Sequence, residues 1–159
     1  MIKVGDNIPA ATVTVINKAG QENVASNDYF SGKKVVLFAL PGAYTPTCSE
    51  AHLPGFVVKH NDIIANGIDT VACLSVNDPF VMKSWQEVQN AENLDMIADG
   101  GAALTKAMDL VLDTGDFGGI RSQRYSMIVD NGVITHFNDE SGSAFEVSDA
   151  ETILRQLQA

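Results

Sequence analysis

The sequence predicts one α/β domain in which helices flank a mixed central sheet and a β-hairpin opens the chain. Two continuous apolar runs, residues 34–40 and 69–76, have the length and composition of buried central strands. A helix-forming segment follows each run, and a second hairpin signal and a last helix complete the chain. This order of elements is typical of a layered α/β sandwich. A length of 159 residues and a hydrophobic fraction of 45% fit a single domain with a buried core.

The first part of the chain begins with the hairpin. The segment "ATVTVI", from residue 10 on, and the segment "ENVAS" flank "NKAGQ", in which Gly20 lies in the predicted turn. The run "KVVLFAL" at 34–40 is the first central strand, because its apolar residues do not alternate with polar ones. Residues 47 to about 66 predict a helix that contains Pro54. Since proline has no backbone N–H, we expect Pro54 to kink this helix after its first turns.

The second central strand is the run "DTVACLSV" at 69–76. Asp78 and Pro79 follow as the N-cap and the first residue of a helix. The inner face of this helix is predicted to carry three residues at helical spacing, Val81, Trp85 and Val88. Residues 94–99, "LDMIAD", predict a short strand, and residues 102–110 predict a further helix.

The last part of the chain contains a glycine-rich loop, a hairpin and a helix. The loop is "GDFGGIRS" at 115–122, and the hairpin spans residues 125–137 with the dipeptide "NG" at its turn. Ser148 and Glu151 have the spacing of a capping box and predict the start of the last helix. The buried face of that helix is expected to consist of Ile153, Leu154 and Leu157.

Composition and charge exclude several classes of function. The net charge of −10 argues against a nucleic-acid partner, because the scattered lysines and arginines form no basic patch that would release counterions. No apolar run approaches the roughly 20 residues that span a bilayer, so we expect no membrane segment. The N-terminal residues have no signal-peptide or transit-peptide pattern, and two cysteines make no disulfide framework. We therefore expect a cytoplasmic location, although a trimmed organellar protein would show the same sequence features.

One of the two cysteines, Cys48, lies between an apolar strand and the start of a helix. This is the arrangement of thioredoxin-like folds, although the chain lacks the C-x-x-C motif of disulfide oxidoreductases. Thr47 and Glu50 have capping-box spacing, so we expect Thr47 to be the N-cap and Cys48 the first helical residue. The free N–H groups and the dipole at a helix start favour an anion, which here is a thiolate.

The helix dipole alone does not account for a reactive thiolate. An ordinary thiol with a pKa near 8.5 is only about 3% ionised at pH 7. Making it mostly ionised requires a shift of about 2.5 pKa units, or roughly 3.4 kcal/mol, whereas the dipole supplies about 0.3–1 kcal/mol. A second cation is therefore required, and an arginine is the obvious candidate. The alternative interpretation is that Cys48 is a small buried hydrophobic residue without reactivity.

Pro41, Thr45 and Cys48 have the spacing P-x-x-x-T-x-x-C, which resembles the peroxiredoxin signature. The longer string "PGAYTPTCSEAHLPGF" is similar to the type II, or atypical, subfamily of the peroxiredoxins. The similarity continues through "ACLSVNDPFVMKSW", "IADG", "RSQRYSMIVDNGV" and "FEVSDAETIL", and so covers nearly the whole chain. The resemblance implies a single thioredoxin-like domain over residues 1–159. It also implies a thiol-dependent peroxidase that reduces hydrogen peroxide and alkyl hydroperoxides.

The resemblance assigns roles to individual residues. It makes Cys48 the peroxidatic nucleophile, which becomes a sulfenic acid, with Pro41 shielding the sulfur and Thr45 hydrogen-bonding the sulfur and the peroxide. The active-site arginine of the family matches Arg124, whereas Arg121 matches the pattern less well. These groups are expected to stabilise charge on the leaving oxygen and to hold the O–O bond in line.

Other groups are expected to complete the substrate site. The backbone N–H groups of Thr47 and Cys48 are expected to bind the peroxide. Phe117 and Ile120 either form an apolar wall that admits alkyl hydroperoxides or are simply core or interface residues. No metal or flavin is required. His52 shares a helix face with Cys48, but a metal site needs three or four ligands, so His52 is expected to pack or hydrogen-bond near the site.

The sulfenic acid at Cys48 has to be reduced by another thiol. The stretch "GSAFEVSDAE" lacks the resolving cysteine that many animal members of the subfamily carry near the last helix. Cys73 is the only other cysteine, and its predicted buried strand favours a structural role over a disulfide with Cys48. We therefore expect an external thiol, from glutaredoxin with glutathione or from thioredoxin, to attack Cys48 directly.

The resemblance also implies a homodimer, with Phe80 and the Thr45-Pro46 turn as candidates for its interface. Two other functions remain open at the level of sequence: a redox-signalling protein that senses peroxide, and a thiol–disulfide exchanger without peroxidase turnover. A sensor would turn over poorly with every reductant. An exchanger would reduce model disulfides, and the missing C-x-x-C motif speaks against it.

Overall fold

The computed structural model describes residues 1–159, and its centre is a seven-stranded mixed sheet with the strand order β2-β1-β5-β4-β3-β8-β9. The three middle strands run parallel to one another: β3 (Lys34–Ala39), β4 (Thr70–Ser75) and β5 (Asp95–Ala98). Antiparallel strands extend the sheet on both sides: β1 (Thr12–Asn17), β2 (Gly20–Ala25), β8 (Tyr125–Asp130) and β9 (Val133–Asp139). The prediction of a mixed central sheet with an N-terminal hairpin is confirmed.

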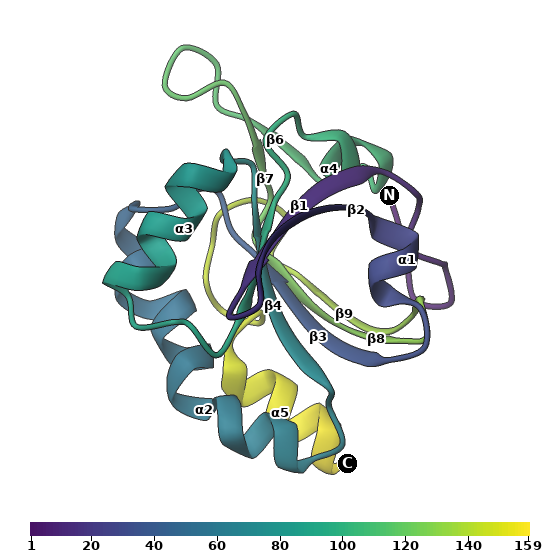
Figure 1. Cartoon of the computed structure of the whole chain (residues 1–159). Coiled ribbons are helices and arrows are strands. Elements are labelled where there is room, and N and C mark those ends of the chain that lie inside the picture. The colour runs from purple at the N-terminus through teal and green to yellow at the C-terminus, as the bar shows by residue number, and fades with distance from the viewer.

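Helices cover both faces of this sheet, and Figure 1 shows the two layers. One face carries α2 (Leu53–Ala65), α3 (Pro79–Val88) and α5 (Ala150–Gln158). The other face carries the short helices α1 (Ser26–Phe30) and α4 (Ala103–Ala107). Five of the six residues of β3 are buried, because both of its faces are covered, and this explains its unbroken apolar sequence. None of the helices has the length and hydropathy that crossing a membrane requires.

Both predicted hairpins are present. In the first, Gly20 pairs with Asn17 as the first residue of β2, so the turn consists of the two residues before Gly20 and the predicted place of Gly20 in the turn is wrong. In the second, Asn131 and Gly132 have φ values of 49° and 80°. This left-handed pair matches the twist of the flanking strands, which is why "NG" connects them.

The structure also corrects the predicted inner face of α3. Asp78 caps this helix, as predicted, because its carboxylate accepts a hydrogen bond from the backbone N–H of Val81. The residues that α3 buries are Met82, Trp85 and Gln86. Val88 is exposed, because it lies outside the face of the helix that Met82 and Trp85 bury against the sheet.

The cap of α5 differs from the prediction. Asp149 is the N-cap, since its carboxylate accepts a hydrogen bond from the backbone N–H of Thr152. The hydroxyl of Ser148 donates to Glu140, so no capping box with Glu151 forms.

Part of the predicted glycine-rich loop is also ordered as a two-stranded ribbon, formed by β6 (Val111–Asp113) and β7 (Ile120–Ser122).

Candidate active site

Cys48 begins a π-helical turn, η1 (Cys48–His52), which leads directly into α2. The chain is already helical before this turn, because the backbone N–H of Ser49 donates to the carbonyl of Thr45 at 2.9 Å. Thr47 therefore has helical dihedral angles, and its side chain caps nothing. The prediction that Thr47 is the N-cap is wrong, because the first helical residue is Pro46, two residues before Cys48.

Pro54 accounts for the irregular turn. It has no N–H to donate to the carbonyl four residues before it, and it lies in the first turn of α2. The backbone N–H of Leu53 instead reaches back five residues to the carbonyl of Cys48. The predicted continuous helix over 47–66 is thus divided into a π-turn and an α-helix, and the irregularity precedes Pro54 rather than following it.

The side chain of Arg124, which directly precedes β8, lies against Cys48. Its Nη2 donates a hydrogen bond to Cys48 Sγ at 3.3 Å, and both residues are buried, with exposed fractions of 2% and 1%. The three ion pairs of the chain lie elsewhere, and none of them includes Arg124. A buried guanidinium without a carboxylate partner is costly unless another anion balances it. The Cys48 sulfur, which carries a negative charge when it is ionised, lies within hydrogen-bond reach of this guanidinium.

His52 fixes the opposite side of the guanidinium. Its Nδ1 lies 2.9 Å from Arg124 Nη1, and its Nε2 lies 3.0 Å from the carbonyl of Ser148. A carbonyl only accepts, so Nε2 carries the proton and Nδ1 accepts from Arg124. Burial and the adjacent Arg124 lower the pKa of His52 to about 3, so the ring is neutral. The expectation that His52 hydrogen-bonds near the site is thereby confirmed.

The loop that joins β9 to α5 supplies the remaining partners of Arg124. Its Nε donates to the carbonyl of Ser143 at 3.2 Å, and its backbone N–H donates to the carbonyl of Gly142 at 2.7 Å. The ring of Phe145 lies 5.8 Å from the guanidinium carbon and 5.0 Å from the ring of His52. No pattern in the sequence marks this loop as part of the site. Its contributions are mostly backbone carbonyls, which leave no signal in the sequence.

Thr45 and Pro41 flank the thiol at the end of β3. The hydroxyl of Thr45 donates to the carbonyl of Gly42 at 2.7 Å, so the predicted hydrogen bond to the sulfur does not form. The lone pairs of the Thr45 oxygen stay available to accept from a bound molecule. Pro41 is half-buried. The guanidinium of Arg121 packs on Gly42, where an added Cβ would lie 3.2 Å from Nη1.

Two backbone donors in the turn that carries Cys48 are unpaired. The N–H groups of Thr47 and Cys48 have no acceptor within the chain, as expected for the first turn of a helix. The Arg124 guanidinium, which donates to the sulfur, adds a charged donor to this turn. Such a set can stabilise negative charge that develops on a reacting oxygen.

Phe117 and Ile120 lie on the β6–β7 ribbon, which projects from the body of the domain (Figure 1). Phe117 is 90% exposed, so within one chain it packs against nothing. Ile120 is also exposed, at 36%. Neither residue belongs to the core. The prediction that they form an apolar wall for alkyl hydroperoxides stays a prediction. The alternative, that they are interface residues, also stays a prediction.

Cys73 lies in the interior of β4, in register with Phe38 of β3 and Met96 of β5. Its side chain is fully buried, and burial raises the pKa of its thiol well above the ordinary value. Both cysteines are free thiols. The predicted buried strand around Cys73 is thus confirmed.

Trp85 links α3 to the active-site turn. Its indole Nε1 donates to the hydroxyl of Ser49, the residue after Cys48, at 3.0 Å. Trp85 was expected to be a core residue, and its ring is indeed fully buried. The hydrogen bond to Ser49 adds a direct contact with the turn that carries the thiol.

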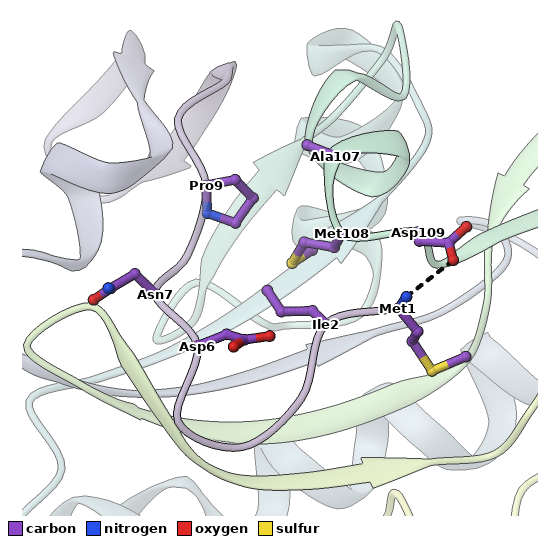
Figure 2. Close-up of a pocket in the computed structure, with 8 residues that line it drawn as sticks. All are labelled: Met1, Ile2, Asp6, Asn7, Pro9, Ala107, Met108 and Asp109. Atoms are coloured by element: carbon purple, nitrogen blue, oxygen red, sulfur yellow. Dashed lines mark ion pairs between the residues drawn. The ribbon is translucent and has the colours of Figure 1, made fainter.

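A cavity of about 460 Å³ lies where the N-terminal segment meets the end of α4. Figure 2 shows its lining and the ion pair between the Met1 amino group and Asp109, at 3.1 Å. Asp6, which also lines it, is engaged by Lys3. The cavity has neither a cysteine nor a histidine in its lining, whereas the Cys48 site has both. No group of three or more His, Cys, Asp or Glu side chains could hold a metal ion.

Comparisons with known proteins agree with this geometry. The model of the Redoxin family matches residues 3–154. The chain is 44% identical over 159 residues to "Peroxiredoxin-2D" of Arabidopsis thaliana, covering 98% of each chain. The crystal structure of reduced Prx3 from Vibrio vulnificus, in complex with hydrogen peroxide, has a TM-score of 0.95 at 55% identity over 99% of both chains. The Plasmodium falciparum antioxidant protein, described as a 1-Cys peroxiredoxin, has a TM-score of 0.89 at 27% identity over 99% of both chains. The thioredoxin-like fold expected from the sequence is confirmed.

Proposed function

This chain belongs to the peroxiredoxin family and is a thiol-dependent peroxidase, and we propose that Cys48 is the nucleophile through which it reduces hydroperoxides. The observation that carries the proposal is the 3.3 Å hydrogen bond from Arg124 to Cys48 Sγ. It joins a guanidinium that has no carboxylate partner to a thiol at the start of a helix, and both features favour the thiolate.

The reaction follows from the groups around the sulfur. The Cys48 thiolate attacks one oxygen of the peroxide, the S–O bond forms and the O–O bond breaks. Negative charge builds on the leaving oxygen, where Arg124 and the free N–H groups of Thr47 and Cys48 stabilise it. The leaving oxygen takes up a proton and departs as water or an alcohol, and Cys48 is left as a sulfenic acid. Thr45 orients the peroxide by accepting from its hydroxyl, and Pro41 shields the sulfur from bulk water.

We propose a one-cysteine cycle in which an external thiol reduces the sulfenic acid. Cys73 is held in the middle of a paired strand, and the raised pKa of its thiol makes it a poor attacking group. Glutaredoxin with glutathione, or thioredoxin, is the proposed reductant. The likeness to a structure described as a 1-Cys peroxiredoxin supports this cycle.

The proposed substrates are hydrogen peroxide and alkyl hydroperoxides. A neighbour at 55% identity was crystallised with hydrogen peroxide, which supports the first of them. For alkyl hydroperoxides, we propose that Phe117 and Ile120 supply the apolar surface, since both lie exposed on the β6–β7 ribbon.

We also propose that the protein is a homodimer that works in the cytoplasm. Phe80 is 79% exposed at the start of α3, and the Thr45-Pro46 turn is accessible too, so both remain candidates for the interface. Sedimentation equilibrium tests the dimer, and a monomer at every concentration would contradict it. A reducing compartment fits the need for external thiols.

Intact mass tests the central proposal. Fully reduced protein is treated with a stoichiometric amount of hydrogen peroxide, with and without a sulfenic-acid trap. We expect a gain of one oxygen atom that the trap captures at Cys48, and we expect Cys48→Ser to abolish both the adduct and peroxide consumption. Activity that persists in Cys48→Ser would mean that the nucleophile is misassigned. A loss of two hydrogens within a monomer would instead mean a Cys48–Cys73 disulfide and would overturn the one-cysteine cycle.

A further inference from the structure

We propose that Glu140, in the loop between β9 and α5, is a positioning residue of the peroxidase site. It orders residues 141–148 so that His52 holds Arg124 against Cys48. This inference rests on the proposed role of Cys48 as nucleophile, and it assigns a task to a residue that has no contact with the sulfur.

The carboxylate of Glu140 organises the end of this loop. Its Oε2 accepts from the backbone N–H groups of Glu146, Val147 and Ser148, each at 2.8 Å, and from the Ser148 hydroxyl at 2.7 Å. The hydrogen bonds from these donors lower the pKa of Glu140 although burial acts against them, so the group stays a carboxylate at neutral pH. Four charge-assisted hydrogen bonds to one oxygen fix the path of the chain through Ser148.

The fixed carbonyl of Ser148 then selects the tautomer of His52. Because this carbonyl accepts from His52 Nε2 at 3.0 Å, the proton stays on Nε2 and Nδ1 remains an acceptor. Arg124 Nη1 donates to that Nδ1 at 2.9 Å, and Nη2 of the same planar group donates to Cys48 Sγ at 3.3 Å. If the Ser148 carbonyl moved, the proton of His52 could sit on Nδ1 instead. Two N–H donors, Nδ1 of His52 and Nη1 of Arg124, would then point at each other with no acceptor between them.

The segment that begins at Glu140 also binds the rest of Arg124. The backbone N–H of Glu140 donates to the Arg124 carbonyl at 3.2 Å, and the Gly142 carbonyl accepts from the Arg124 N–H at 2.7 Å. The Ser143 carbonyl accepts from Nε at 3.2 Å. The orientation of the guanidinium therefore depends on this one loop at several points.

The arrangement orients Arg124 without neutralising it. No carboxylate forms an ion pair with Arg124, and the charge of Glu140 is directed at backbone and hydroxyl donors. The loop holds the guanidinium through two uncharged groups, the neutral ring of His52 and the Ser143 carbonyl. The full positive charge of Arg124 thus stays available to the thiolate, whereas a carboxylate placed directly on Arg124 would compete with the sulfur.

The test compares Glu140→Gln with Glu146→Gln, which removes the same charge from the same loop at an exposed side chain. We expect Glu140→Gln to lower the second-order rate constant for peroxide reduction about tenfold or more, because small misplacements of a catalytic group have effects of that size. The thiolate fraction at neutral pH, read from ultraviolet absorbance with Cys48→Ser as the blank, should fall in parallel. Glu146→Gln should change neither. A folded Glu140→Gln protein with an unchanged rate constant and thiolate fraction would overturn the proposal.

A double-mutant cycle separates positioning from a merely structural role. If Glu140 acts through Arg124, then Glu140→Gln in an Arg124→Gln background should change the remaining rate less than about twofold, because coupled residues are not additive. Full additivity of the two losses would overturn the proposal.

Ser148→Ala keeps the proposal testable if Glu140→Gln does not fold, since it removes one of the four donors and leaves the carbonyl in place. We expect a loss of about two- to fivefold in the same rate constant, and no loss would count against the proposal. Cys48→Ser is measured as a control in both the Glu140 and the Ser148 experiments. If it stays active, the proposed nucleophile fails; if it is inactive while Glu140→Gln and Ser148→Ala behave as wild type, only the role of Glu140 fails.

Discussion

Cys48 and Cys73 belong to the same hydrophobic cluster and are equally hidden from solvent, with exposed fractions of 1% and 0%. Their immediate surroundings differ completely. Cys48 lies at the start of a helical turn with free N–H groups and a guanidinium on its sulfur. Cys73 lies between two neighbouring strands, and burial raises the pKa of its thiol. Burial therefore does not distinguish the two thiols. The nearby cation and the unpaired backbone donors do, and they support the proposal that Cys48 is the nucleophile.

The largest effect should come from removing the cation. We expect Arg124→Gln to slow the reaction of peroxide with Cys48 by about 10²–10³, the usual loss when one preorganised donor to a developing charge is deleted. The measurement is the rate of peroxide consumption under conditions where the oxidation step limits turnover. Arg121→Gln is the matched control, because Arg121 packs on Gly42 and has no contact with the sulfur. A larger loss in Arg121→Gln than in Arg124→Gln would move the role to Arg121.

An intermediate effect should appear in the dependence of stability on pH. His52 has a pKa of about 3 in the folded protein and an ordinary value near 6.5 when unfolded. Between these values the unfolded chain binds a proton that the folded protein excludes. The free energy of unfolding should therefore fall as the pH drops from about 6.5 toward 3, by up to about 1.4 kcal/mol per pH unit from this group. Denaturant unfolding of wild type and His52→Asn measures it. Equal slopes in the two proteins would contradict the prediction.

The smallest effect on catalysis should come from Cys73→Ser. With glutaredoxin as reductant, we expect turnover within about twofold of wild type, because an external thiol attacks Cys48 directly. Stability should fall by about 1–3 kcal/mol, since the new hydroxyl is buried without an assured partner. Thermal unfolding and peroxidase assays on the same preparation separate the two outcomes. A folded Cys73→Ser protein with a large loss of turnover would restore a resolving role to Cys73.

The central strands and the two hairpins could be predicted because their signals are local. The run over 34–40 is apolar without alternation, and the "NG" dipeptide has the dihedral angles that its hairpin needs. The same holds for Asp78 and Pro79 at the start of α3. Arg124 lies far from Cys48 in sequence, and its proximity followed from the family resemblance rather than from any local pattern.

Both predicted capping boxes, at Thr47 and at Ser148, were wrong for the same reason. The spacing of two residues does not show where the helix begins or which other group binds the capping side chain. Thr47 is already inside the helix, because Pro46 is well suited to the first helical position. The hydroxyl of Ser148 donates a hydrogen bond to Glu140, and Asp149 caps α5 instead. Glu140 itself could not have been identified, because three of its four donors are backbone N–H groups, which any residue except proline would provide.

The hydrogen bond between Trp85 and Ser49 makes Trp85 a candidate intrinsic fluorescence probe of the active-site turn. The chain contains a single tryptophan, so under tryptophan-selective excitation its emission comes from one indole, which contacts the residue after Cys48. We expect a displacement of the Cys48–His52 turn to change the polarity around that indole. The proposed oxidation and reduction of Cys48 should then be visible in real time as a change of intrinsic fluorescence in a rapid-mixing instrument, without a dye or a coupled enzyme.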